Sequence, residues 1–94
     1  MAATIEVEQT GPEQFRVQVA EGTTQTSHQV TMKASEYERL SGNRVPPAEL
    51  VRRAFEFLLA RESKEQILRN FDLTVIGRYF AEFERVIKRN LEKQ

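Results

Sequence analysis

Apolar and polar residues alternate along the first third of the chain, which is the pattern of β-strands with one buried face. The alternation runs through residues 5–7 and 15–19, and the segment Thr10–Glu13 between them predicts a turn. The pair Glu21–Gly22 predicts a tight hairpin loop, because glycine adopts a positive φ without a steric penalty. We therefore expect a three-stranded antiparallel β-meander over about residues 4–32.

The expected hairpin loop also sets a register and separates two faces of the sheet. With Glu21 and Gly22 as the loop, Val17 would lie opposite Thr26. One face would be buried, and it would carry Phe15, Val17, Val19, Thr24, Thr26, His28, Val30 and Met32. The other face is polar and would be solvated, and it would carry Arg16, Gln18, Ala20, Thr23, Gln25, Ser27, Gln29 and Thr31.

From residue 35 onward, apolar residues recur every three or four positions, which predicts helices. The capping-box pattern of Ser35 and Glu38 predicts a short helix that stops at Gly42. The main helix is expected from about Pro47 to Glu62, because proline suits the first turn of a helix. Its apolar stripe is wide enough to cover a sheet.

Two more helices are expected in the C-terminal third. A second capping box, formed by Ser63 and Gln66, predicts a short helix that runs through Phe71. Asp72 would cap the last helix, which should bend at Gly77.

These elements define an α+β fold, in which an N-terminal three-stranded antiparallel β-meander is followed by three to four helices packed on one sheet face. The short connections favour a single small domain of residues 1–94, with the helical part at about residues 35–91.

Composition excludes several classes of protein. Fourteen basic and fourteen acidic residues cancel, which argues against nucleic-acid binding by bulk charge. No apolar run approaches the roughly 18 residues of a membrane span. The first ten residues have neither the early basic charge nor the apolar stretch of a leader peptide, so we expect a cytoplasmic protein.

The sequence also contains no convincing candidates for catalytic residues. The chain has no cysteine, and His28 is its only histidine, which favours a structural role for that ring. The paired acids Glu36 and Glu38, and likewise Glu62 and Glu65, lie at expected helix starts, where carboxylates complement the helix dipole. We expect no catalytic residue, no cofactor and no metal ion, and therefore no enzyme.

The helices carry more large rings than a small sheet can cover. Helices of this length cannot turn every ring inward, so some should form an exposed apolar patch. The candidate partner-binding residues are Phe57, Tyr79, Phe80 and Phe83. A protein partner, or self-association through these rings, is therefore the expected function.

Residues 14–85 resemble a group of short, uncharacterised bacterial proteins, through the passage QVTMKASEYERL and the run ESKEQILRNFDL. The resemblance implies a bacterial cytoplasmic protein and implies no activity.

A second resemblance links the strand VTM and the run AELVRRA to the ribbon-helix-helix repressors and antitoxins. In that family, strands from two chains pair and insert alternate side chains into the major groove of DNA. The resemblance implies DNA contacts by Gln29, Thr31 and Lys33, with Arg52 and Arg53 as further candidates on the following helix. A DNA-binding regulator or antitoxin is therefore the alternative to an interaction module.

Overall fold

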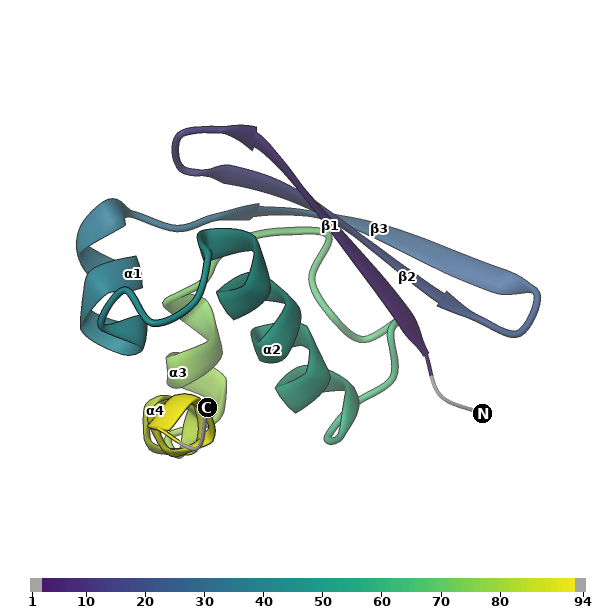
Figure 1. Cartoon of the computed structure of the whole chain (residues 1–94). Coiled ribbons are helices and arrows are strands. Elements are labelled where there is room, and N and C mark those ends of the chain that lie inside the picture. The colour runs from purple at the N-terminus through teal and green to yellow at the C-terminus, as the bar shows by residue number, and fades with distance from the viewer. Residues whose placement is uncertain (1–2, 93–94) are drawn as a thin grey trace.

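The computed structural model describes residues 3–92, which form a four-stranded sheet with four helices on one side of it (Figure 1). In chain order the elements are β1 (Thr4–Gly11), β2 (Gln14–Glu21), β3 (Thr24–Thr31), α1 (Ala34–Ser41), α2 (Pro47–Leu59), β4 (Asn70–Asp72), α3 (Val75–Tyr79) and α4 (Phe83–Glu92). The expected α+β class is confirmed.

The sheet has the strand order β1-β2-β3-β4. The first three strands form the expected antiparallel meander. The fourth strand was not expected; β4 runs parallel to β3 and places Phe71 opposite Val30. The prediction of only three strands is therefore wrong.

The register of the β2–β3 hairpin differs from the expected one by two residues. The loop is Gly22–Thr23, so that Glu21 pairs with Thr24 and Val17 pairs with His28. Gly22 has a φ of 62°, a backbone conformation that residues with a Cβ rarely adopt. Because side chains alternate along a strand, a shift of two residues leaves each one on the face predicted for it.

The segment after α2 does not form the expected short helix. The N–H of Ser63 does donate to Oε1 of Gln66, over 2.9 Å, but only one turn forms. The chain then extends, and the N–H of Gln29 donates to the carbonyl of Arg69 over 2.7 Å. Without β4, the outer edge of β3 would present a row of unpaired backbone donors and acceptors. The segment before β4 forms hydrogen bonds with this edge instead of forming the hydrogen bonds of a helix.

The start of α1 also differs from the prediction. The helix begins at Ala34, and Ser35 does not cap it. Instead, the N–H of Ala34 donates to the carboxylate of Glu13 over 3.3 Å, so the β1–β2 turn supplies the acceptor. The predicted stop at Gly42 is confirmed: its φ is 59° and its N–H donates to the carbonyl of Glu38.

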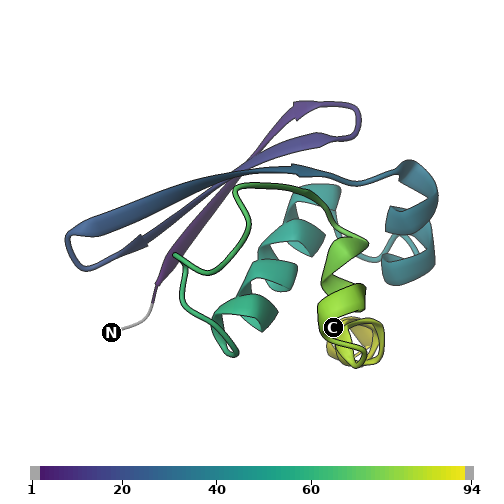
Figure 2. The same ribbon diagram turned by 180° about the vertical axis from the view of Figure 1, so that it is seen from behind.

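The helices form a layer that is two helices deep (Figure 1 and Figure 2). Helix α2 lies against β1 and β2, and α3 lies against β4, whereas α1 and α4 pack on other helices. The expected last helix is divided into α3 and α4, and the break begins at Phe80, whose backbone is extended. The number of helices thus agrees with the expectation of three to four, although the elements differ.

Candidate functional site

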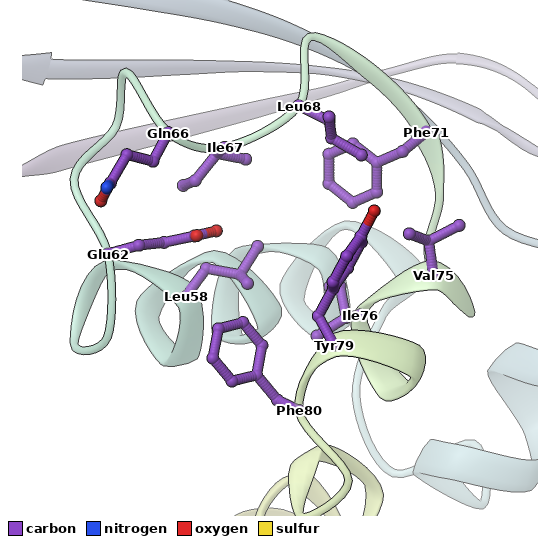
Figure 3. A pocket seen from close by; sticks show the side chains of 10 residues that line it. All are labelled: Leu58, Glu62, Gln66, Ile67, Leu68, Phe71, Val75, Ile76, Tyr79 and Phe80. Carbon is purple, nitrogen blue, oxygen red and sulfur yellow. The ribbon is translucent and has the colours of Figure 1, made fainter.

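A groove lies between the end of α2, the segment before β4, and α3 (Figure 3). Its volume is about 380 Å³. The lining is mostly apolar and consists of Leu58, Glu62, Gln66, Ile67, Leu68, Phe71, Val75, Ile76, Tyr79 and Phe80.

The floor and the rim of the groove differ in exposure. Leu58, Ile67 and Ile76 form the floor and are buried. Leu68 and Tyr79 belong to the rim and are 48% and 71% exposed. They are the only large apolar residues with high exposure in the described range 3–92. Exposed apolar residues that are scattered singly carry little meaning, but two of them at one groove mark a candidate contact surface.

Glu62 lines the groove, and two arginines are sequence neighbours of its rim residues. The carboxylate of Glu62 is directed into the groove beside Leu58 (Figure 3), and it makes no ion pair within residues 3–92. Arg69 follows Leu68 and Arg78 precedes Tyr79, and both are exposed. Neither arginine makes an ion pair in that same range.

His28 anchors the rim to the sheet. Its Nδ1 lies 2.8 Å from the carbonyl oxygen of Leu68, and its Nε2 lies 2.8 Å from Oγ1 of Thr26. A carbonyl can only accept, so Nδ1 carries a proton, and in the neutral ring Nε2 accepts from the Thr26 hydroxyl. Burial lowers the pKa of His28, and the charge of Arg69 lowers it further, while the bond to Leu68 opposes the shift. The ring, which is 1% exposed, is therefore a structural bridge, as expected.

The structure divides the four candidate partner-binding residues into two pairs. Tyr79 and Phe80 line the groove. Phe57 and Phe83 are 5% and 2% exposed, and their ring centroids are 5.1 Å apart. The guanidinium of Arg61 lies 3.6 Å from the Phe57 ring centroid and covers it. Phe57 and Phe83 are core residues in this structure, so the prediction that they face a partner is wrong.

Sequence reasoning did not identify the other groove residues. The expected short helix from Ser63 through Phe71 would include Leu68, and Glu62 was expected only as an acid at a helix terminus. The signal for β4 was available in Asn70–Asp72, where one apolar residue stands between two polar ones. Three residues are too few to distinguish a strand from a helical turn by periodicity alone.

The candidate DNA-binding residues are not brought together. Gln29 and Thr31 lie on the sheet face opposite α2, and the hydroxyl of Thr31 donates to Asp72 over 2.7 Å. Burial acts to raise the pKa of Asp72, but the hydrogen bonds from Thr74 and Thr31 together outweigh it and lower the pKa, which leaves a carboxylate next to any approaching phosphate. In addition, β3 is paired on both edges, whereas a ribbon-helix-helix dimer needs one edge free.

The arginines of α2 are already engaged within the chain. Arg52 donates to Glu49 and Glu56, and Arg53 donates to Glu49 and to Asn90 of α4 over 2.7 Å. Hydrogen bonds from Arg52 and then Arg53 outweigh desolvation and lower the pKa of Glu49 to about 2. Arg53 therefore joins α2 to α4, whereas Arg52 pairs with carboxylates of α2 itself.

Within the described part of the chain, no group of three or more His, Cys, Asp or Glu residues is placed to hold a metal ion. Over the same residues, no helix combines the length and the apolar character needed to cross a membrane. Comparisons with protein-family models, with curated proteins and with solved structures each give no match.

Proposed function

We propose that the protein is a non-enzymatic interaction module that binds a protein chain through the groove between α2, β4 and α3. The observation that supports this function is the position of Leu68 and Tyr79, the two highly exposed large apolar residues of the described chain, at the rim of the same apolar groove.

A protein chain suits this surface better than a small molecule does. A volume of about 380 Å³ lies near the lower limit for small-molecule pockets, roughly 300 Å³. Leu68 and Tyr79 line this groove and are 48% and 71% exposed, so together they offer apolar surface to a partner larger than a small molecule. A protein surface can place one apolar side chain in the groove and cover the rim at the same time, which removes more apolar area from water.

Photocrosslinking in the cells that make the protein tests this function. A photoreactive phenylalanine analogue in place of Tyr79 should give a discrete protein adduct on illumination, because this side chain stands at the contact surface. The same analogue in place of Gln25, an exposed residue on the other face of the sheet, serves as the control and should give none. The proposed function fails if position 79 gives no adduct, or if both positions give the same ones.

DNA binding remains the alternative function. Lys33 and the polar outer face of β3 favour it, whereas Asp72 and the engaged arginines of α2 oppose it. The salt dependence of binding tests it, because affinity that comes from phosphate contacts falls steeply as the salt concentration rises.

A further inference from the structure

We infer that the occupant of the groove is a second copy of this chain, bound about a twofold axis so that Tyr79 of each protomer enters the groove of the other. This inference rests on the proposed function and specifies its partner.

The first argument is that the projecting group and the hollow lie on the same surface. Tyr79 is 71% exposed and belongs to the groove lining itself, next to Phe80 on α3. In a twofold interface each contact occurs twice, so one patch must supply both the side chain that inserts and the cavity that receives it. The α2–β4–α3 groove carries both, because Leu58 and Ile67 form a buried floor close to the projecting ring (Figure 3).

The second argument is charge. Glu62, at the end of α2, directs its carboxylate into the groove (Figure 3), while Arg78 on α3 directly precedes the projecting Tyr79. Within residues 3–92, neither charge has an ion-pair partner. When Tyr79 enters the partner's groove, it brings Arg78 toward the partner's Glu62, and the twofold axis repeats this pairing. A second copy of the chain carries both charges and therefore supplies a partner for each of them.

The other exposed feature that invites self-association is the free edge of β1. Twofold antiparallel pairing of that edge would bring Glu6 of one copy close to Glu6 of the other, while Glu8 already pairs with Arg16 of its own chain. Like charges opposite one another on a sheet are destabilising. Negative charge therefore protects this edge, and the groove is the better self-complementary surface.

Sedimentation equilibrium with charge-reversed variants tests the inference. The wild-type chain should show a monomer–dimer equilibrium over about 1 to 500 μM, a range in which a modest twofold interface is populated. Glu62→Arg alone and Arg78→Glu alone should each weaken self-association by at least about tenfold, because like charges then meet twice in each homodimer. An equimolar mixture of the two variants should regain a dimer of wild-type affinity, because both opposite-charge pairs are restored in the heterodimer.

Matched controls separate this effect from a general change of charge. Glu38→Arg on α1 and Arg85→Glu on α4 make the same reversals at exposed positions away from the groove, and they should leave the association constant unchanged. Circular dichroism of every variant verifies that it is folded.

Two results would overturn the inference: a wild-type chain that stays monomeric throughout the range, or variant mixtures that fail to regain the dimer. Photocrosslinking then decides the proposed function separately. An adduct of foreign mass at position 79 would keep the interaction module and reject the second copy, whereas no adduct would reject both.

Discussion

Replacing the buried imidazole of His28 should cost a large part of the stability of the fold. His28→Leu removes the hydrogen bond to the Leu68 carbonyl and leaves the buried hydroxyl of Thr26 without its acceptor. Each lost hydrogen bond costs about 1 kcal/mol, and a buried polar group left unsatisfied costs about 1 to 3 kcal/mol. We expect a loss of about 2 to 4 kcal/mol, out of the roughly 5 to 14 kcal/mol typical of a chain of 94 residues.

Urea unfolding of a double-mutant cycle measures this contribution. Thr26→Val alone should cost about 1 to 2 kcal/mol, because it leaves Nε2 of His28 buried without a donor. The double variant should lose less than the sum of the single losses by about 1 kcal/mol, because neither partner then remains unsatisfied. Strictly additive losses would refute the assigned bond between Thr26 and Nε2.

The pH dependence of stability and the tautomer of His28 give two independent tests of its bridging role. Because burial lowers the pKa of this histidine below 6.5, the unfolded chain binds a proton first as the pH falls. The stabilising contribution is therefore complete above pH 6.5 and is lost as the pH falls toward the folded-state pKa. Between about pH 7.5 and about pH 5.5 the wild type should lose stability and His28→Leu should lose less, since this is the only histidine. Long-range ¹⁵N–¹H spectra that place the proton on Nε2, or a normal titration near 6.5, would contradict the bridge to Leu68.

Three further predictions follow from contacts elsewhere in the fold. Phe57→Ala should destabilise the protein by about 3 to 5 kcal/mol in urea unfolding of the monomer, because its ring is buried. Tyr79→Ala should cost less than about 0.5 kcal/mol in the same assay, because its ring is exposed. Equal losses would contradict the assignment of Phe57 to the core and of Tyr79 to the surface. Glu49→Gln should cost about 1 to 2 kcal/mol at neutral pH, after allowance for solvent screening of its arginine partners. Because its pKa is lowered to about 2, this contribution is present above 4.5 and fades as the pH falls toward 2, so urea unfolding at acid pH should show a smaller difference between variant and wild type. Mixed-sequence DNA should bind weakly at physiological salt, because Arg52 is already paired; tight binding that falls steeply with salt and is lost in Lys33→Ala would instead favour the DNA-binding alternative.

Strand periodicity predicted the sheet faces but could not determine its register. Val17, His28 and Val30 are all buried as expected, although the loop is one residue farther along the chain than the Glu21–Gly22 pair suggested. A shift of two residues across the hairpin exchanges each side chain for another on the same face, so the hydrophobic pattern is satisfied by either register. The backbone conformation at Gly22 selects one of the two registers, and the pattern of polar and apolar residues contains no information about that conformation.

In the helical half, a helix could be predicted where the sequence has a long apolar stripe. It could not be predicted where contacts with distant residues determine the secondary structure. Helix α2 starts at Pro47 as its sequence indicates. The segment from Ser63 has the same local signals for a helix, including the hydrogen bond between Ser63 and Gln66, yet it ends in a strand. The free edge of β3, more than thirty residues earlier in the chain, competes for its backbone, and no local pattern contains that information.

The groove and the DNA-binding alternative both depend on what pairs with the outer edge of β3. In the structure, β4 occupies this edge and the residues next to β4 form part of the groove. Pairing of β3 with a second chain would require Asn70–Asp72 to leave, together with the bonds from Gln29 to Arg69, from Thr31 to Asp72, from Leu73 to Thr31 and from His28 to Leu68. Four hydrogen bonds at about 1 kcal/mol each and the burial of Phe71 at about 2 kcal/mol make this opening cost roughly 6 kcal/mol, so the closed form should dominate by about 10⁴-fold. Native-state hydrogen exchange measures that ratio directly: the amide of Gln29 should be protected by about this factor. An amide of Gln29 that exchanges at the rate of an open strand edge would show that β3 is available for pairing, and the groove would then lose the segment that forms its rim.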